Sequence, residues 1–396
     1  MRQISAKLDF VVGDAAVLAR MPELPPFRVF DDRALTFLRA LAAELFAAGE
    51  GRTYPDLAAF AFWCRPSSLL PLREKYGRAR LGRGLAFHVA PSNVPLNFAY
   101  SLVAALLAGN ANAVRLPARD FAQTALMGAA LNRLLATGAF ADVAARLCLF
   151  RYGHEREATD ALSAACASRL IWGGDDTVAE IRKSPLPPRA NEITFPDRYS
   201  ICLIHSERYL ADYDRQRTAQ DFFNDTYLND QNACTAPRLI FWFGGAAERA
   251  RAVFWPALRE RLERYTLQAS QTVDKLAGFY RYAAQAPCRL SLDGDCKIFR
   301  VAVPEISPDI TNHFQNSGYF YEYDARDLEE ILPVCGRKCQ TLSYIGFDGA
   351  ELREFVLAAA PFGVDRIVPV GRTMDFSLVW DGVDLVRTLS REVALP

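Results

Sequence analysis

The segment 85–117, LAFHVAPSNVPLNFAYSLVAALLAGNANAVRLP, decides the fold class of this 396-residue chain. It contains a short apolar run at 85–91, an apolar amphipathic stretch at 97–108 and a second short apolar run at 111–116. A strand, a helix and a second strand in this order form the βαβ unit of a parallel sheet. The segment therefore predicts an α/β fold with an open, mostly parallel sheet.

The same alternation of apolar runs and amphipathic stretches continues beyond this segment. We expect a helix at 121–136, a strand at 146–150, a helix at 160–167, a strand at 170–172 and a helix from residue 176. In sheets of this kind, ligands bind outside the carboxyl ends of the strands. No GxGxxG sequence follows the first strand, so a non-standard Rossmann-like domain is the remaining option.

A proline-rich break at 184–188 precedes the second half of the chain. Two extended pieces, a helix and a strand that opens a second α/β domain are expected next, at 192–195, 199–204, 209–228 and 239–243, with a last strand within 362–371. The predicted domains are a mostly helical N-terminal segment at 1–75, a cofactor-binding Rossmann-like domain at 76–230, a catalytic domain at 231–350 and a C-terminal segment at 351–396 that packs back on the sheets.

The composition excludes several classes of protein. Basic and acidic side chains are balanced at 46 each, which argues against a nucleic-acid surface because phosphate binding needs a basic excess. The nine cysteines occur singly, without metal-ligand spacing, so we expect no metal and reduced thiols in the cytoplasm. The longest apolar run, 98–108, is too short to span a bilayer, and no signal peptide is evident.

One cysteine lies in a polar break between the expected helix at 209–228 and the strand at 239–243. The sequence of residues 229–238 is NDQNACTAPR, and its thiol is Cys234. A thiol at such a junction is a candidate nucleophile, because backbone amides or cations nearby can lower the pKa of a thiol and supply the thiolate at neutral pH. The alternative is that Cys234 is a small buried apolar side chain.

Four short motifs occur in the order and rough spacing of aldehyde dehydrogenase superfamily motifs. They are Ala90–Pro95, Gly109–Pro117, Ile171–Gly174 and Gln231–Pro237. With Gly363–Gly371 and Trp380–Gly382 added, the chain resembles the LuxC-type acyl-CoA reductases, the fatty acyl reductases best known from bacterial bioluminescence. The resemblance covers residues 80 to 390 and implies an aldehyde-dehydrogenase-like fold with two Rossmann-like open-sheet domains, one for the cofactor and one for catalysis.

The resemblance implies two catalytic residues. Cys234 matches the nucleophile, and Asn93 matches the asparagine whose side-chain amide forms an oxyanion hole together with the backbone N–H of the cysteine. Removing a donor of this kind costs about 3 kcal/mol of transition-state stabilisation. The alternative for Asn93 is a turn former before Pro95.

The resemblance also implies a cofactor site made of Ser92, Arg115, Arg119, Gly173 and Gly174. Arg115 falls where the superfamily keeps a lysine at the adenosine ribose, and Arg119 falls where many NAD-dependent members have a glutamate. An arginine favours a ribose 2′-phosphate where a glutamate would repel it, so NADPH is the expected cofactor. The two glycines suit the close approach of a pyrophosphate to a helix N-terminus.

Alternatives remain open for these cofactor residues. Arg115 and Arg119 are equally consistent with solvated surface charges. Asp175 and Asp176 follow the two glycines; they would repel a pyrophosphate, and either is also a candidate helix cap.

The activity implied by the resemblance is NADPH-dependent reduction of an acyl thioester, an acyl-CoA or an acyl-protein, to the aldehyde through an acyl-cysteine intermediate. Hydrolytic aldehyde dehydrogenases carry a water-activating glutamate before a Gly-Gly-Lys run, whereas here the nearest counterpart, Glu192, is followed by Ile-Thr-Phe-Pro. The alternatives are a hydrolytic enzyme with Glu192 as its base and a non-catalytic scaffold subunit.

Partners follow from the same chemistry. A ligase or acyltransferase must supply the activated acyl group, and a homo-oligomer is expected. The pair Gln340-Thr341 also resembles a pair of the LuxC type, although the sequence alone suggests no physical role for it.

Overall fold

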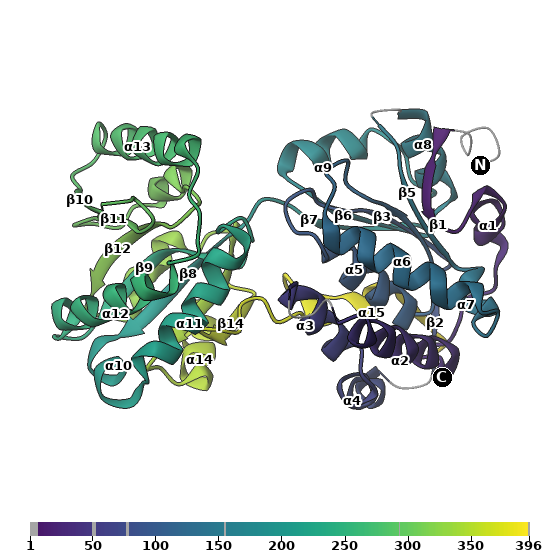
Figure 1. The fold of residues 1–396 in the computed structure, drawn as a ribbon, viewed down its shortest axis with the longest axis horizontal. Helices are drawn as coiled ribbons and strands as arrows, with labels where there is room; N and C mark the ends of the chain where they lie inside the picture. Colours follow the sequence, from purple (N-terminus) through teal and green to yellow (C-terminus); the bar gives the residue numbers. More distant parts are fainter. Residues whose placement is uncertain (1–6, 50–52, 77–78, 154–155, 293, 395–396) are drawn as a thin grey trace. The chain divides into compact units, whose positions relative to one another are not determined.

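The structure is a computed structural model that describes residues 7–49, 53–76, 79–153, 156–292 and 294–394. The chain divides into two compact units. Unit 1 is formed by the chain before Asp197 and after Ser377, and unit 2 is formed by Asp197–Ser377 (Figure 1). Within the described ranges, no helix is both long enough and apolar enough to cross a bilayer.

Unit 1 is built on a six-stranded sheet in the order β1-β5-β4-β3-β6-β7 (Figure 1). Its strands are β1 (Asp9–Val12), β3 (Leu85–Val89), β4 (Ala111–Arg115), β5 (Leu147–Arg151), β6 (Ser168–Trp172) and β7 (Asn191–Phe195). All neighbours are parallel except β1, which runs antiparallel to β5 at the edge. The chain moves outward from β3 through β4 and β5, and then in the other direction through β6 and β7. The predicted open, mostly parallel sheet is therefore confirmed.

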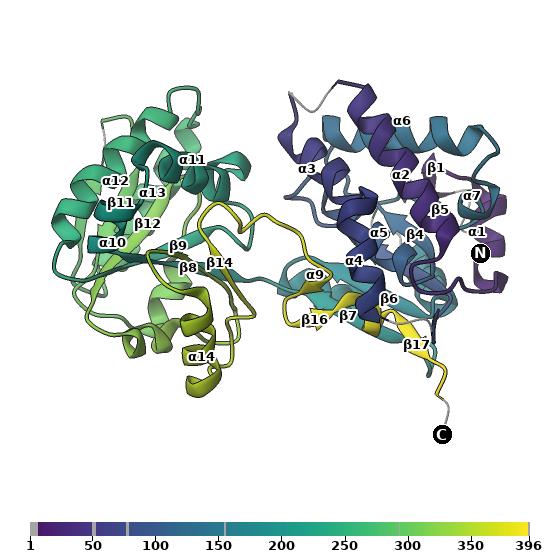
Figure 2. The same cartoon turned by 90° about the horizontal axis from the view of Figure 1, so that it is seen from below.

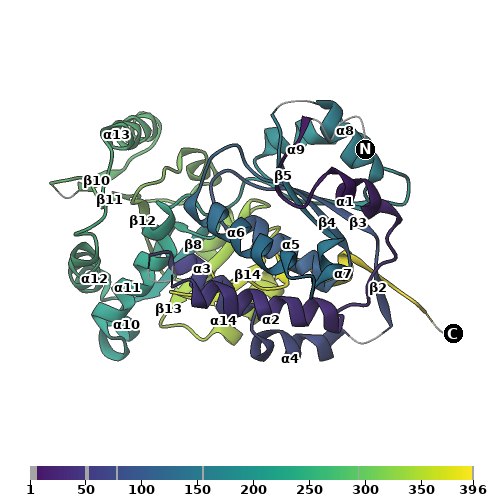
Figure 3. The same cartoon turned by 45° about the vertical axis from the view of Figure 1, so that its right-hand side comes forward.

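Helices cover both faces of this sheet. They are α1 (Ala15–Arg20), η2 (Met21–Glu23), α2 (Asp32–Ala47), α3 (Pro55–Trp63), α4 (Pro66–Tyr76), α5 (Asn97–Leu107), α6 (Ala122–Ala136), α7 (Ala141–Ala144), α8 (Arg156–Ala165), α9 (Asp175–Arg182) and α15 (Leu385–Thr388). Apolar side chains of α1, α8 and α9 form one core with the strands. Helix α5 is almost entirely buried because its sequence is apolar all round. Figure 3 shows α2 running beside α6 and α7, with which it is in contact.

The end of the chain returns to unit 1. Strand β17 (Ser390–Glu392) pairs antiparallel with β2 (Arg80–Gly82), and β15 (Val379–Trp380) pairs with β16 (Val383–Asp384). Leu385, Val386 and Leu389 are fully buried there. Residues 385–389 therefore contribute to the core of the unit that the chain before Asp197 begins.

Unit 2 is built on a seven-stranded sheet in the order β10-β11-β12-β9-β8-β13-β14. Its strands are β8 (Tyr199–His205), β9 (Pro237–Phe243), β10 (Arg289–Leu292), β11 (Phe299–Ala302), β12 (Tyr319–Ala325), β13 (Cys339–Ile345) and β14 (Arg366–Pro369). All neighbours are parallel except β10, which runs antiparallel to β11 at one edge. The long apolar runs of β8 and β9 are buried on both faces, as parallel strands require.

Two separate apolar cores hold helices on the two faces of this sheet. The helices are α10 (Ser206–Asp212), α11 (Arg215–Thr226), η4 (Tyr227–Asn229), α12 (Ala247–Arg261), α13 (Ala269–Ala283), η5 (Pro308–His313), η6 (Leu328–Val334) and α14 (Gly349–Ala359). Helices α10, α11 and α12 belong to one core, and α13 and α14 belong to the other. Figure 2 shows α14 and α11 on opposite sides of β8 and β9.

The structure differs from the sequence expectations at three places. It divides the units at 196/197 and not at 230/231, because β7 joins the first sheet while β8, only three residues later, pairs with β9 and β13 of the second. The expected helix at 209–228 is two helices, since Asp214 caps α11 by accepting from the backbone N–H of Arg217. The segment at 1–75 also contributes strand β1.

Candidate active site

Cys234 lies in a short loop, residues 230–236, between η4 and β9; we call this segment the Cys234 loop. The loop enters the amino end of β9, in contrast with the usual position of ligands at carboxyl strand ends. Asp230 and Gln231 have φ angles of 50° and 57°, a left-handed conformation that reverses the chain after η4. Cys234 itself is partly exposed, and no disulfide links any of the nine cysteines, all of which lie in described residues.

The buried side chain of Gln231 fixes the Cys234 loop to the sheet. Its Nε2 donates to the carbonyl oxygens of Pro237 (2.9 Å) and Tyr319 (3.1 Å). Its Oε1 accepts from the backbone N–H groups of Gly318 (3.0 Å) and Tyr319 (3.1 Å). The amide thus uses both its donor and its acceptor on the amino ends of β9 and β12, which holds both the start of the loop and its exit.

The carbonyl oxygen of Cys234 is held by Ser200, the second residue of β8. The Oγ of Ser200 donates to this oxygen at 2.7 Å and accepts from the backbone N–H of Thr341 at 3.2 Å. Strand β13 bulges at this point, because Tyr199 pairs with Cys339 and Ile201 pairs with Leu342. Two residues, Gln340 and Thr341, therefore oppose the single Ser200.

This bulge gives the Gln340-Thr341 pair a physical role. The extra residue turns the N–H of Thr341 toward Ser200, so that one hydroxyl connects two backbone segments. Ser200, Gln340 and Thr341 are all fully buried. Sequence analysis missed Ser200, because its partners lie 34 and 141 residues away.

A third support comes from the segment 371–374. Thr235 Oγ1 and Asn229 Nδ2 lie 3.3 Å and 3.8 Å from the sulfur of Met374. The buried carboxyl of Asp225 accepts from the N–H groups of Gly371 (2.6 Å) and Thr373 (3.1 Å). Burial raises the pKa of Asp225 to about 7. This carboxyl, which sequence analysis also missed, holds a segment that packs on the Cys234 loop.

Asn93, the second expected catalytic residue, belongs to unit 1. It is exposed in the turn between β3 and α5, together with Ser92. The turn continues into α5 without a side-chain cap. Asn93 and Cys234 thus belong to different units.

The expected cofactor residues of unit 1 all follow the carboxyl ends of neighbouring strands. Ser92 follows β3, Arg115 ends β4 with Arg119 close behind, and Gly173 and Gly174 follow β6. These three strands are adjacent in the order β4-β3-β6. The chain direction changes at β3, and this is where open α/β sheets bind ligands.

The two arginines differ in their surroundings. Arg115 donates from Nη2 to the carbonyl oxygen of Gly153 (2.9 Å), and its guanidinium lies 4.4 Å from the ring centre of Tyr152. Arg119 is exposed, with its guanidinium 4.9 Å from the ring centre of Phe121. Within the described part of the chain, Arg119 forms no ion pair. Arg119 is therefore the more available cation.

The glycine turn after β6 has a packing reason of its own. A Cβ on Gly173 would lie 3.0 Å from Thr177 Cγ2, so a larger residue would crowd the first turn of α9. Gly174 is the N-cap residue of α9, and Asp175 and Asp176 lie in its first turn. Neither aspartate is therefore the N-cap residue, and their charges complement the helix dipole.

Glu192 is committed to a structural ion-pair network. Its carboxylate accepts from Arg169 Nε and Nη2 at 2.8 Å and 2.5 Å and from Arg182 Nε at 2.7 Å. Arg169 is almost fully buried, with a side-chain exposure of 3%. Glu192 is the second residue of β7 and pairs with Arg169, the second residue of β6. It thus lies at the amino ends of these strands, opposite the end that carries Gly173.

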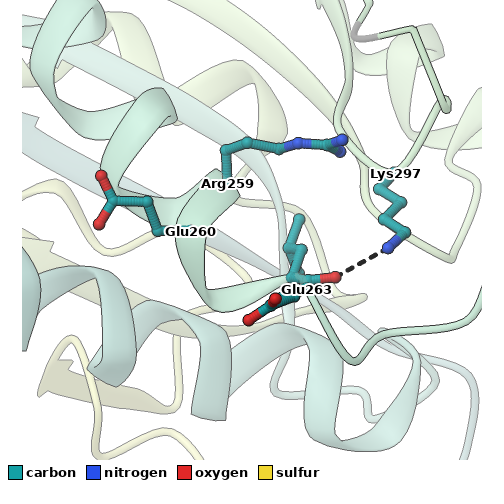
Figure 4. A pocket seen from close by; sticks show the side chains of 5 residues that line it. Arg259, Glu260, Glu263 and Lys297 are labelled. Atoms are coloured by element: carbon teal, nitrogen blue, oxygen red, sulfur yellow. Dashed lines mark hydrogen bonds between the residues drawn. The ribbon is translucent and has the colours of Figure 1, made fainter.

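Described residues of unit 2 line at least two cavities. One, of about 410 Å³, is lined by Arg259, Glu260, Leu262, Glu263 and Lys297 and contains none of the expected site residues (Figure 4). There, Lys297 Nζ donates to the carbonyl oxygen of Leu262 at 2.8 Å, beyond the end of α12. The other, of about 290 Å³, borders the Cys234 loop, and its lining includes Asp230, Asn232 and Asn316.

Comparison with known proteins identifies the class of fold. The structure is similar to 1-pyrroline-5-carboxylate dehydrogenase of Thermus thermophilus, with a TM-score of 0.62 and 14% sequence identity over 95% of this chain and 82% of that one. The expected aldehyde-dehydrogenase-like fold, with two Rossmann-like open-sheet domains, is confirmed.

The sequence then identifies the family. Residues 68–392 match the family described as acyl-CoA reductase (LuxC), and the chain belongs to this family. It is 24% identical over 317 residues to the long-chain acyl-protein thioester reductase of Aliivibrio fischeri, covering 76% of this chain and 61% of the relative. It is 25% identical over 334 residues to long-chain acyl-protein thioester reductase 2 of Photobacterium leiognathi, covering 82% and 66%. The chain thus spans less than two-thirds of the length of these relatives.

Proposed function

We propose that this protein reduces an acyl thioester to the aldehyde with NADPH, through an acyl intermediate on Cys234. The observation that carries the proposal is the construction of the Cys234 loop, in which Gln231 and Ser200 fix the backbone on both sides of a partly exposed thiol. A cysteine kept only for packing would not need such support. Unit 2 is proposed as the catalytic part and unit 1 as the cofactor-binding part.

The residues at the carboxyl ends of β4, β3 and β6 suit nicotinamide adenine dinucleotide phosphate. Arg119 is an exposed cation near the carboxyl end of β4, suited to a ribose 2′-phosphate. Arg115 ends the same strand, and Ser92 follows the adjacent strand β3. The turn at Gly173 and Gly174 offers the N-terminus of α9. When bound, NADPH supplies a hydride to the acyl carbon.

The step proposed for the protein's own residues is transfer of the acyl group from the donor thiol to the Cys234 thiol. The Cys234 thiolate attacks the thioester carbonyl, a new carbon–sulfur bond forms, and the thiolate of the donor leaves. The N–H of Cys234 and the side-chain amide of Asn93 are proposed to donate to the carbonyl oxygen as it gains negative charge. After reduction, the thiohemiacetal releases the aldehyde, and Cys234 leaves as the thiolate.

The hydrolytic alternative gains no support from the geometry. Its only candidate base was Glu192, and both carboxylate oxygens of Glu192 already accept from arginines. A thioester reductase needs no activated water. The acyl donor is proposed to be an acyl-CoA or an acyl-protein, supplied by a ligase or acyltransferase, and the enzyme is proposed to be a homo-oligomer.

Substitution of the nucleophile tests the proposal. Cys234→Ser is expected to abolish aldehyde formation from long-chain acyl-CoA and NADPH, because an alcohol is a far weaker nucleophile than a thiolate. Radiolabelled acyl-CoA should acylate the wild type and not the variant. Cys288→Ser, which replaces another partly exposed thiol of unit 2, is the matched control and should be acylated normally. Retention of more than a small fraction of the turnover by Cys234→Ser would refute the assignment.

A further inference from the structure

The guanidinium of Arg238 closes the Cys234 loop. Its Nη2 donates to the carbonyl oxygen of Gln231 at 3.0 Å, so the second residue of the loop is tied to the second residue of β9. Its Nη1 donates to the carbonyl oxygen of Gln315 at 3.0 Å and to Oδ1 of Asn316. Cys234 therefore lies within a ring of chain that one cation completes.

The charge of Arg238 is not neutralised by these contacts. All three acceptors are neutral amide oxygens, and among the residues that the structure describes Arg238 forms no ion pair with a carboxylate. Burial lowers the pKa of Arg238 to about 10, while the charge of Cys234 acts in the opposite direction. Electrostatic coupling between two groups is reciprocal, so the guanidinium also favours the charged form of the thiol.

Two other ionisable side chains lie close to the loop and carry opposite charges. The carboxylate of Asp230 accepts from Tyr265, from Gln271 at 2.6 Å and from Ser317 at 3.0 Å. The buried Lys275 donates to the carbonyl oxygens of Cys296 (2.6 Å) and Ser317 (2.7 Å), and burial lowers its pKa to about 8. These two groups carry opposite charges near the same Ser317, so their effects on Cys234 oppose each other.

We infer that Arg238 is the cation that stabilises the Cys234 thiolate, and that the Cys234 loop is built to hold this charge beside the sulfur. The inference rests on the proposed function, in which Cys234 attacks a thioester. The proton of the thiol leaves to solvent, and the positive charge compensates for the negative sulfur that remains. No histidine or carboxylate base is required, since a cation near a thiol is sufficient to populate the thiolate at neutral pH.

The pH dependence of Cys234 alkylation tests the inference. Iodoacetamide is applied to the native enzyme over a range of pH, and the peptide containing Cys234 is quantified by mass spectrometry. This peptide must be resolved because the chain has nine cysteines, and Cys234→Ser gives the background. The wild type should reach half its maximal rate below pH 8.5, roughly the value for an unperturbed thiol.

Two substitutions separate the charge of Arg238 from its hydrogen bonds. Arg238→Gln should move the midpoint of alkylation upward by about one pH unit or more, which is about a tenfold loss of thiolate at lower pH. Arg238→Lys keeps the charge and should move the midpoint much less. Arg208→Gln is the control, since Arg208 also donates to a carbonyl oxygen of unit 2, that of Gly346 at 3.0 Å. It should leave the midpoint unchanged.

A third variant keeps Arg238 in place in case its removal unfolds the loop. Asn316→Asp places a carboxylate where Arg238 Nη1 already donates, so it neutralises the guanidinium without deleting it. The midpoint should again move upward. If the midpoint stays at the wild-type value in both Arg238→Gln and Asn316→Asp with the fold intact, the inference is wrong.

The same samples keep the two proposals distinct. If wild-type Cys234 shows the low midpoint and the Arg238 dependence but is never acylated by acyl-CoA or acyl-protein, the proposed function fails while the inference stands. If Cys234 is acylated but its alkylation midpoint does not change when Arg238 is substituted, the inference about Arg238 fails while the proposed function stands.

Discussion

Arg119 and Asp120 are adjacent in the turn after β4 but have different surroundings. Asp120 is paired with Arg151 at 3.0 Å, whereas Arg119 is exposed beside Phe121. In the proposed cofactor site, an arginine at this carboxyl strand end would favour a ribose 2′-phosphate over a 2′-hydroxyl. The proposed preference for NADPH therefore depends on a single side chain.

Arg119→Glu is expected to lower the ratio of kcat/KM for NADPH to that for NADH by about tenfold or more, which corresponds to roughly 1.4 kcal/mol. The reason is that an anion replaces a cation near the phosphate. Initial rates with the two cofactors measure the ratio. Arg20→Glu, the same charge change at the exposed end of α1, is the control. An equal loss with both cofactors would show that Arg119 supports the fold and does not recognise the phosphate.

Glu192 provides a second prediction at this scale. Glu192→Gln should lower the free energy of unfolding by about 3 kcal/mol, because it leaves the buried Arg169 without its carboxylate. Reduction of acyl-CoA per folded molecule should stay within about tenfold of wild type, whereas loss of a general base costs about 10²–10⁴-fold. Thermal unfolding and aldehyde formation at low temperature measure the two effects. Accumulation of a stalled acyl-enzyme in this variant would favour the hydrolytic activity.

At the scale of elements, the bulge in β13 helps to position Cys234, the proposed nucleophile. Ser200 Oγ connects the Thr341 N–H to the Cys234 carbonyl oxygen, so a distortion in one strand positions a loop that precedes another. Such bulges are common next to active sites, where they redirect one group without disturbing the rest of the sheet.

Ser200→Ala is expected to lower kcat by about tenfold or more while KM for the acyl donor changes little, because loosening the nucleophile affects the reaction more than binding. The matched control is Ser343→Ala. Ser343, on β13, is also buried and donates to a carbonyl oxygen of β8, that of Ile201 at 3.2 Å, but among the described residues it forms no hydrogen bond with the Cys234 loop. Steady-state kinetics of both variants give the comparison. Equal losses of kcat would mean that Ser200 has only a general packing role.

The elements also show what a single sequence can predict. The strands of the first sheet from β3 to β7 were predicted nearly to the residue, because apolar runs and turn residues are local signals. Strand β1 was missed, since four residues at an antiparallel edge carry little pattern. The boundary near Pro196 was missed because β7 and β8 are both extended and only hydrogen-bond partners assign them to different sheets.

The candidate site was also predictable only where the signal in the sequence is local. Cys234 stands out by its position at a polar junction, and the glycine turn after β6 stands out by composition. Ser200, Asp225 and Arg238 do not, because each acts through partners that the fold brings from distant parts of the chain. Long-range hydrogen bonds leave no periodic trace in the sequence.

For the whole molecule, the discontinuity of unit 1 has an energetic consequence. Leu389→Ala is expected to destabilise unit 1 by about 2–5 kcal/mol although it lies near the end of the chain, because its side chain is fully buried. Val393→Ala, at a side chain 46% exposed, should change stability by less than about 0.5 kcal/mol. Chemical denaturation of both variants tests the difference. A negligible effect of Leu389→Ala would mean that the C-terminal segment does not contribute to the core of unit 1.

The return of the chain to unit 1 also affects the order of events during synthesis. Residues 197–377 leave the ribosome as one uninterrupted stretch that contains the whole of the second sheet. Strand β2 forms a bridge with Arg28, which precedes it in the chain, but its ladder with β17 can form only after residues 390–392 have been made. Domains generally fold as units as they emerge, usually from the N-terminus onward. In this protein we expect the opposite order, in which the part that carries Cys234 folds on the nascent chain before residues 378–394 emerge and complete unit 1.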